Sequence, residues 1–172
     1  MAKKLKVAQV KCIEETTEPG SDDPYIVAFV GKKKTGQADS VLTVGPSPWR
    51  NMSSGAVRDT DMTITDYNPD HFYLVALVEL DVNKDVDAAT RKSIKDWVSP
   101  FYRAYAVDGA SNQQIATNMK SQLDVALDSY LDNDDRVGAT KHLQFASPPA
   151  TKTFRYIGDG GDYKFWFKVT AS

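Results

Sequence analysis

The sequence predicts a mainly β fold, an antiparallel β-sandwich that carries a two-helix insertion between strands. Short apolar segments bounded by turn-forming residues, typical of strands, fill the chain before about residue 80 and after about residue 140. Between them, apolar residues recur at spacings of three and four, as they do in amphipathic helices. The 172 residues suffice for one compact domain with a core but scarcely for two. We therefore expect a single domain over residues 1–172, with the helical insertion at about 86–131.

Five strands are predicted before the helices. We expect them at residues 5–13, 25–30, 40–44, 59–65 and 72–80. The apolar run Leu74–Val78 in the fifth segment predicts a strand that is buried on both faces. After the third segment, Pro46 and Pro48 exclude regular ladder pairing, and Trp49 is expected to plug the core beneath this loop.

Two amphipathic segments follow, and their apolar stripes predict helices. The first, Val86–Tyr105, is interrupted at Ser99-Pro100, which indicates either one kinked helix or two short helices. Ser111 or Asn112 is expected to cap the second, whose apolar stripe continues to Leu131. Such stripes usually face a core, and the alternative is a face for a partner or a membrane surface. Whether the helices cover the sandwich or stand away from it stays open at this point.

Three more strands are predicted after the helices, at residues 142–145, 153–157 and 163–169. Gly158–Asp162 connects the last two. Because this glycine-rich segment leads into a strand rather than a helix, we interpret it as a hairpin turn and not as a phosphate-binding loop. Three consecutive aromatic residues, Phe165-Trp166-Phe167, predict a last strand that is packed on both sides.

Composition and motifs argue against several classes of function. The formal net charge of −2 gives the chain no general attraction for nucleic acid. No glycine-rich phosphate loop or nucleophile motif is present, and His71 and His142 lack the neighbours of a zinc site. The single cysteine, Cys12, lies in a predicted strand, where a buried and unreactive thiol is expected. We therefore expect a protein that is not an enzyme.

The N-terminus and the length of the apolar runs bear on location. Met1–Lys6 is basic but is not followed by the apolar core of a signal peptide. The longest apolar run is too short to span a bilayer. We expect a soluble protein, either cytoplasmic or exported without a cleavable signal peptide.

Two acidic stretches flank the ends of predicted strands. The first, Thr17–Tyr25, combines turn-forming residues with acids and leads directly into the second strand. The other begins where the fifth strand ends, with Glu79 and Asp81 on the same side of the chain. Carboxylates at the mouth of a sandwich suit calcium, which takes about six to eight oxygen ligands. The alternative is that these acids are simply solvated.

The acidic stretches carry a resemblance to a known family. Gly20–Val27, with the sequence Gly-Ser-Asp-Asp-Pro-Tyr-Ile-Val, resembles the first calcium-binding loop of C2 domains, although it holds one extra aspartate. Val78–Asp81 resembles the start of the third loop of that family, and Asn133–Gly138 resembles its end. The chain is also similar to uncharacterised bacterial proteins that combine this acidic loop, a helical segment and a Gly-Asp-Gly-Gly-x-Tyr hairpin, found here at Gly158–Tyr163.

The resemblance implies an eight-stranded, C2-like β-sandwich that binds calcium between loops at one end, with the helices inserted in the third acidic loop. Glu79 stands where C2 domains usually have an aspartate, and the helical block separates the two halves of the third loop. The calcium ligands that the resemblance implies are Asp23, Glu79, Asp81 and Asp135, together with Glu18 and Asp134.

The function expected from this resemblance is a calcium-dependent, non-enzymatic binding module. Its partner would be an anionic phospholipid membrane surface or a protein. The alternative is a structural or assembly protein, which packs against copies of itself and in which the calcium site is vestigial or purely structural.

Overall fold

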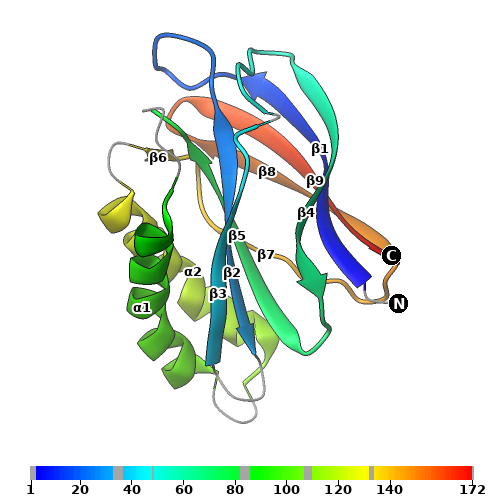
Figure 1. The fold of residues 1–172 in the computed structure, drawn as a ribbon, viewed down its shortest axis with the longest axis vertical. Helices are drawn as coiled ribbons and strands as arrows, with labels where there is room; N and C mark the ends of the chain where they lie inside the picture. The colour runs from blue at the N-terminus through cyan, green and yellow to red at the C-terminus, as the bar shows by residue number, and fades with distance from the viewer. Residues whose placement is uncertain are drawn as a thin grey trace.

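The computed structural model describes residues 3–32, 37–47, 49–81, 86–106, 110–131 and 134–171. Two antiparallel sheets face each other, and two helices cover the outer face of one of them (Figure 1). The predicted mainly β sandwich with a two-helix insertion is confirmed. The described residues form nine strands rather than the eight expected.

The first sheet has the order β4-β1-β9-β8, and all its neighbours are antiparallel. Its strands are β1 (Lys3–Glu14), β4 (Val57–Tyr67), β8 (Ala150–Gly158) and β9 (Gly161–Ala171). The second sheet has the order β3-β2-β5-β6, and β7 also pairs with β5. Its strands are β2 (Pro24–Lys32), β3 (Gln37–Val44), β5 (His71–Glu79), β6 (Asp135–Arg136) and β7 (Lys141–His142).

The strand expected at 142–145 is wrong in its extent. Pairing with β5 ends at His142, and the chain then bends toward the loop that precedes β8. Leu143 and Phe145 are nevertheless buried between the sheets, so these apolar residues fill the core without forming a ladder. The additional strand is β6, and it lies in the segment for which the sequence predicted only an acidic loop.

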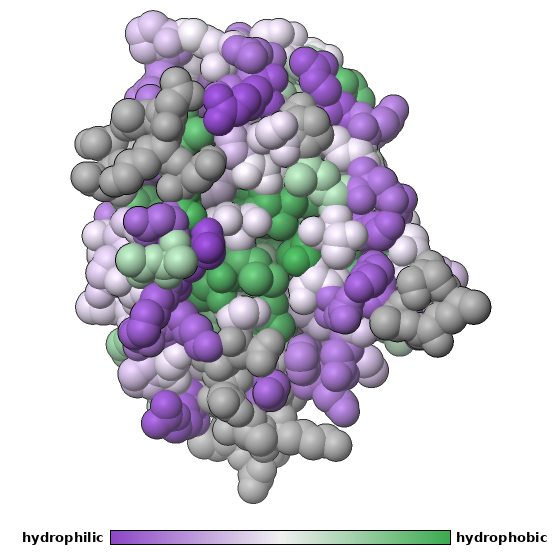
Figure 2. Space-filling view, in the orientation of Figure 1, coloured by the Kyte–Doolittle hydropathy of each residue, from purple (hydrophilic) through white to green (hydrophobic). Residues whose placement is uncertain are grey.

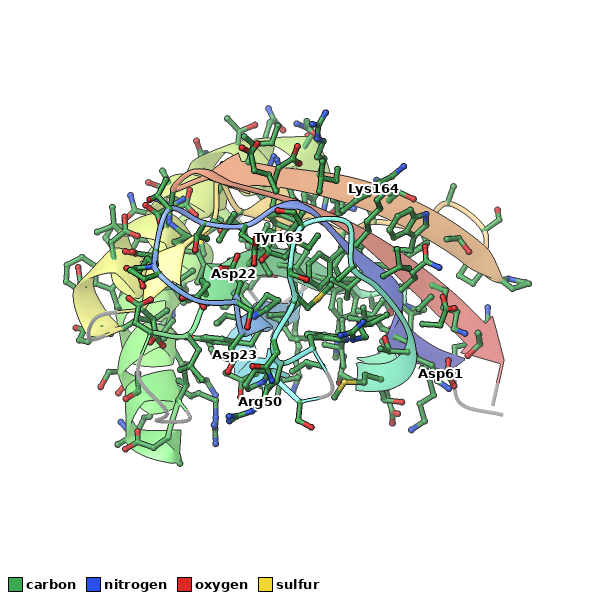
Figure 3. The ribbon with its side chains drawn as sticks, turned by 90° about the horizontal axis from the view of Figure 1, so that it is seen from above. Asp22, Asp23, Arg50, Asp61, Tyr163 and Lys164 are labelled. Atoms are coloured by element: carbon green, nitrogen blue, oxygen red, sulfur yellow. The ribbon has the colours of Figure 1, made fainter. Side chains whose placement is uncertain are left out.

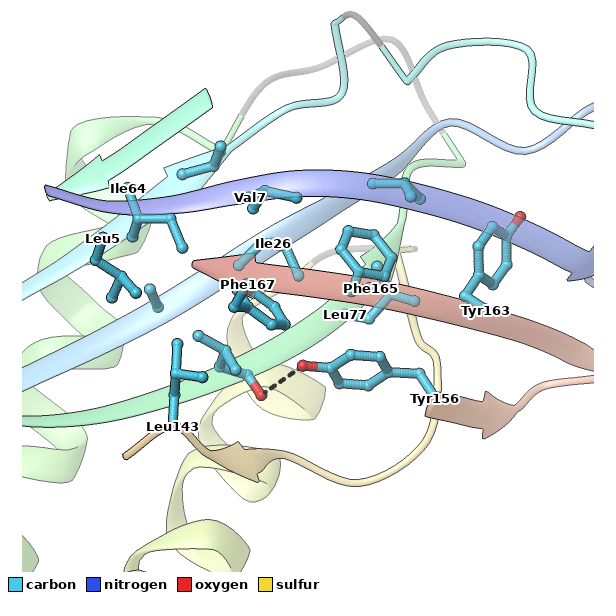
Figure 4. Packing of buried hydrophobic residues seen from close by; sticks show 14 of the residues in the cluster. Leu5, Val7, Ile26, Ile64, Leu77, Leu143, Tyr156, Tyr163, Phe165 and Phe167 are labelled. Atoms are coloured by element: carbon cyan, nitrogen blue, oxygen red, sulfur yellow. Dashed lines mark hydrogen bonds between the residues drawn. The ribbon is translucent and has the colours of Figure 1, made fainter. Parts of the chain in front are cut away.

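The core between the sheets is built from alternate residues of the facing strands (Figure 4). Tyr156 reaches across it and donates a hydrogen bond to the carbonyl oxygen of Val75, at 3.3 Å. Trp49 is fully buried in the same core, which confirms the expected plug beneath the proline-rich loop. Cys12 is also fully buried, as expected, and burial raises the pKa of its thiol to about 11.

The last strand is packed on one side only, and the expectation of two buried faces is wrong. Tyr163, Phe165 and Phe167 point into the core, whereas Trp166 is half-buried on the opposite face. The helices cover the other sheet, so this outer face meets solvent. There the ammonium group of Lys164 lies 4.8 Å from the centre of the Trp166 ring, which suits an aromatic side chain at a wet surface.

The helices form a third layer on the outer face of the β3-β2-β5-β6 sheet. Apolar side chains of α1 (Ala88–Tyr105) and α2 (Asn112–Tyr130) form a second core with the outward residues of β2 and β5. The two central strands are therefore buried on both faces, as the run Leu74–Val78 predicted. In this core the Tyr102 ring meets the Phe29 ring edge-on, with 5.2 Å between the ring centres.

The two open questions about the helices are answered by packing and capping. Helix α1 is one helix with Pro100 inside it, because buried residues on both sides of the proline, Val98 and Tyr102, rest on the sheet. Ser111, not Asn112, caps α2, and it forms a capping box with Gln114.

Candidate metal site

Strand register brings the acidic segments together at one end of the sandwich. Glu79, the last residue of β5, is paired with Pro24 of β2 on one side and with Asp135 of β6 on the other. The β8–β9 turn joins the same end, because the amide nitrogen of Thr17 donates to the carbonyl oxygen of Asp159, at 3.4 Å. Segments far apart in sequence thus meet where the central strand ends.

Three carboxylates form the centre of this site. Oxygen atoms of Glu18, Glu79 and Asp81 all lie within 4.8 Å of one another, close enough for one cation to contact all three. Glu79 is only 5% exposed, whereas Glu18 and Asp81 are exposed to solvent. The buried carboxylate forms the floor of the group, and the two exposed ones leave room for water ligands.

Without a cation, the ionised forms of the central carboxylates are disfavoured by burial and by mutual repulsion. Burial, and then a hydrogen bond to Asp81, raises the pKa of Glu79 to about 8. The pKa of Glu18 is raised by its hydrogen bond to Asp81 and by the negative charge of that residue. A divalent cation would remove the repulsion and favour the ionised form of each group.

Asp134 and Asp135 add two more carboxylates to the acidic group, both near Asp81. Asp134 accepts hydrogen bonds from the Tyr25 hydroxyl at 2.8 Å and from the backbone nitrogen of Asp81 at 3.3 Å. Burial raises its pKa despite these two donors. The pKa of Asp135 is raised by burial and then by the charges of Asp159 and Asp81. Both predicted residues therefore lie beside Asp81.

Asp23 contributes its backbone rather than its carboxylate to the central group. Its amide nitrogen donates to Glu79 Oε1 at 3.0 Å. Its carboxylate accepts from the amide nitrogen of Asn51 at 2.7 Å and lies 3.7 Å from the Arg50 guanidinium. Figure 3 shows Asp23 near Arg50, on the side away from Tyr163.

The neighbouring Asp22 is an internal anchor. It is 3% exposed and accepts hydrogen bonds from the amide nitrogen and the hydroxyl of Thr16, both at 2.9 Å, and from the Tyr163 hydroxyl. Its backbone also pairs with Met52. These contacts fix the β1–β2 loop that carries Glu18.

Asp159 is the acidic residue that sequence reasoning missed. It lies in the β8–β9 turn with a φ of 50°, and its negative charge is one of the causes that raise the pKa of Asp135. The signal was an aspartate flanked by glycines in a hairpin that returns to the same end of the sandwich. The hairpin turn expected at Gly158–Asp162 is confirmed, and Asp159 lies at its tip.

The aromatic residues of α1 divide between the core and the surface. Tyr102 is fully buried, and Trp97, with 39% of its surface exposed, contacts Phe101 and Tyr130. Within the described part of the chain, neither helix has the length and apolar character needed to cross a membrane.

Comparisons with known proteins find a likeness of fold among solved structures. No protein-family model matches the chain, and no curated protein sequence matches it. Among solved structures, one titled "Structure of a C2 domain" is similar over 99% of this chain and 99% of its own, with 10% sequence identity and a TM-score of 0.45.

Proposed function

We propose that the protein is a calcium-dependent, non-enzymatic binding module, in which calcium is held by acidic loops at one end of the β-sandwich. The observation that carries this proposal is the convergence of Glu18, Glu79 and Asp81 within 4.8 Å. These residues come from two segments that are held together by the pairing of β2 with β5. The C2-like loop sequences support the same conclusion independently of the geometry.

The chemistry of the donors favours calcium over a transition metal. The described acidic group offers carboxylate oxygens and carries no histidine or cysteine, and hard cations such as calcium prefer oxygen. The buried Glu79 would contact the ion from the protein interior, and the exposed Glu18 and Asp81 would contact it from the solvent side. Water would complete a shell of about six to eight ligands.

The other predicted ligands differ in how readily they could contact the ion. Asp134 and Asp135 lie beside Asp81 and add negative charge, together with Asp159. For Asp23 to join the shell, its carboxylate must exchange Asn51 and Arg50 for the ion. We therefore expect Asp23→Asn to weaken calcium binding less than Asp81→Asn does.

Bound calcium would join the β1–β2 loop, the end of β5 and the start of β6, and it would neutralise this end of the molecule. A neutralised end can approach an anionic phospholipid surface or an acidic protein, which the free acids would repel. If calcium serves only to join these segments, the protein is instead a structural or assembly protein with a structural calcium site.

Isothermal titration with calcium chloride tests the proposed site. The unaltered protein should bind calcium, and Asp81→Asn should abolish the heat of binding. Asp96→Asn is the matched control, since Asp96 is an exposed acid on α1 outside the acidic group. Equal binding by both variants, or none by the unaltered protein, would contradict the proposal.

Two further assays separate docking from assembly. Sedimentation with phosphatidylserine vesicles in calcium and in chelator measures membrane docking. Size-exclusion chromatography with multi-angle light scattering under the same conditions measures self-association. Calcium binding that changes neither of these would favour the purely structural site.

A further inference from the structure

The outer face of the first sheet carries like charges directly opposite one another. Strand register pairs Lys11 of β1 with Lys164 of β9, and Lys164 with Arg155 of β8. Farther along β9, Lys168 is paired with Lys6 of β1. Side chains that face each other in an antiparallel pair have Cβ atoms about 4.5–5.5 Å apart, so each pair of cations lowers stability unless an anion lies beside it.

The row that holds Lys11 and Lys164 has two uncompensated charges. In the described part of the chain, neither of these lysines pairs with a carboxylate. The Lys164 ammonium group lies over the ring of Trp166, which holds it on this face without neutralising it. Arg155, in contrast, is neutralised, because its Nε atom donates to Asp162 at 2.7 Å. The two lysines are therefore the charges of this row that can bind an anion.

The other row has one anion for two cations. The Asp61 carboxylate of β4 lies 2.7 Å from the ammonium groups of both Lys6 and Lys168. Lys4, farther along β1, pairs with Asp66. Five outward lysines of β1 and β9 therefore share two carboxylates, which leaves a local positive charge on a chain whose formal net charge is −2. The lysine stripe, as we call this set, consists of Lys4, Lys6, Lys11, Lys164 and Lys168.

The lysine stripe is long and narrow. It follows two neighbouring strands that lie about 4.8 Å apart, and its two rows of paired lysines are about 14 Å apart along β9. Acids of β4 flank it on one side, namely Asp59, Asp61 and Asp66. Figure 2 shows hydrophilic side chains (purple) on the side of the molecule where β1 and β4 lie in Figure 1. A linear polyanion can follow this stripe, whereas a flat anionic surface would also meet the flanking acids.

Trp166 lies between the two rows and bears on the kind of polyanion. Binding of single-stranded nucleic acid without sequence preference depends on aromatic rings that stack with the bases. The Lys164 ammonium group already lies 4.8 Å from the centre of the Trp166 ring. Among the described strand residues, no second aromatic side chain shares this outer face. The stripe therefore offers cations without a stacking surface, which favours a polyanion that carries its charges along a saccharide chain.

We propose that the lysine stripe binds an acidic polysaccharide, whose sulfate or carboxylate groups lie along β1 and β9. One anionic group would contact Lys11 and Lys164 together and offset the repulsion between them. A second group would contact Lys6 and Lys168 in competition with Asp61. This proposal goes beyond the calcium site: the stripe residues are not among the predicted calcium ligands, so the polysaccharide should bind in chelator.

Fluorescence anisotropy in chelator tests the proposal with labelled octasaccharides of heparin, which is sulfated, and of polygalacturonate, which carries only carboxylates. At least one of the two should bind at low salt. Lys11→Gln and Lys164→Gln should each weaken binding by about tenfold and lower the slope of log Kd against log salt concentration by about one. Lys92→Gln removes the same charge from an exposed position on α1, beside the other sheet, and should leave binding unaltered.

The stability of these variants separates lost binding from lost folding. Since each removes one member of a repulsive pair, the Tm of Lys11→Gln and of Lys164→Gln without ligand should equal or exceed that of the unaltered protein. The proposal is overturned if neither octasaccharide binds or if Lys11→Gln and Lys92→Gln bind equally well. It is also overturned if single-stranded DNA or phosphatidylserine vesicles bind in chelator and are lost in Lys11→Gln while both octasaccharides fail, since the stripe would then serve nucleic acid or lipid.

Discussion

The hydroxyl of Tyr163 in β9 donates a hydrogen bond to the carboxylate of Asp22, 141 residues earlier in the chain. Both residues are buried. Burial, and then this hydrogen bond, raises the pKa of Tyr163 well above its usual value, so the tyrosine remains a donor. The last strand therefore fixes the loop that carries Glu18, and the acidic end depends on the first sheet as well as the second.

Replacing Tyr163 with phenylalanine should lower the free energy of unfolding by about 1–3 kcal/mol, because the buried Asp22 carboxylate loses one of its donors. Urea denaturation measures this change. Tyr130→Phe removes a hydroxyl from a residue that is 38% exposed and should have little effect. Equal stability of the two variants would show that the contact does not stabilise the loop.

Without calcium, the free energy of unfolding should fall as the pH rises from about 4.5 to about 8. In this window the Glu79 carboxyl keeps its proton in the folded state, whereas it has ionised in the unfolded state. The folded state then binds more protons, so raising the pH favours unfolding, by roughly a few kcal/mol for one buried group. Glu79→Gln should flatten this dependence. A profile that is equally steep in Glu79→Gln would assign it to other groups.

The contact between Gly31 and Tyr102 requires glycine at position 31. A Cβ atom there would lie 2.5 Å from the Tyr102 ring, which belongs to the core beneath α1. Gly31→Ala should therefore destabilise the protein by about 1–3 kcal/mol through overpacking. A double-mutant cycle with Tyr102→Leu checks the cause, since the smaller side chain should recover part of the loss. Additive effects in this cycle would contradict the proposed clash.

The helical layer should unfold together with the sandwich. Leu123 of α2 is fully buried in the second core, and Leu123→Ala should cost about 2–5 kcal/mol. Val125, two residues on, is 45% exposed, and Val125→Ala should be nearly neutral. Denaturation followed by both tryptophan fluorescence and circular dichroism should give one transition. Separate transitions would mean that the helices are an independent unit.

Most strands were predictable because their signals are local. The apolar run of β5 indicated a strand buried on both faces, which the helices on one side and the first sheet on the other explain. Strand β6 has only two residues, Asp135 and Arg136, and it exists because the edge of β5 offers them a partner. No pattern within two residues predicts such pairing. For β9 the expectation of two buried faces was wrong, because Trp166 shares the outer face with Lys164 and Lys168 and only alternate residues of the strand are buried.

The site was predictable in part for the same reason. Glu79 and Asp81 were predictable because they stand at the end of β5, a strongly apolar strand. Glu18 lies in the loop before β2, the strand that pairs with β5. Asp22 and Asp23 were harder to separate, because successive residues point to opposite sides and only distant partners fix which side is inward. The contribution of Asp159 depends on the docking of the β8–β9 turn, which brings Gly158 against Gly138.

The central claim, that calcium binds the folded acidic end, is tested most directly by a thermal melt in chelator and in millimolar calcium, with magnesium as control. A ligand that binds only the folded state must stabilise it, so we predict a calcium-specific rise of several degrees in Tm. The rise should be lost in Asp81→Asn and kept in Asp96→Asn. No rise at saturating calcium, or an equal rise in Asp81→Asn, would contradict the account.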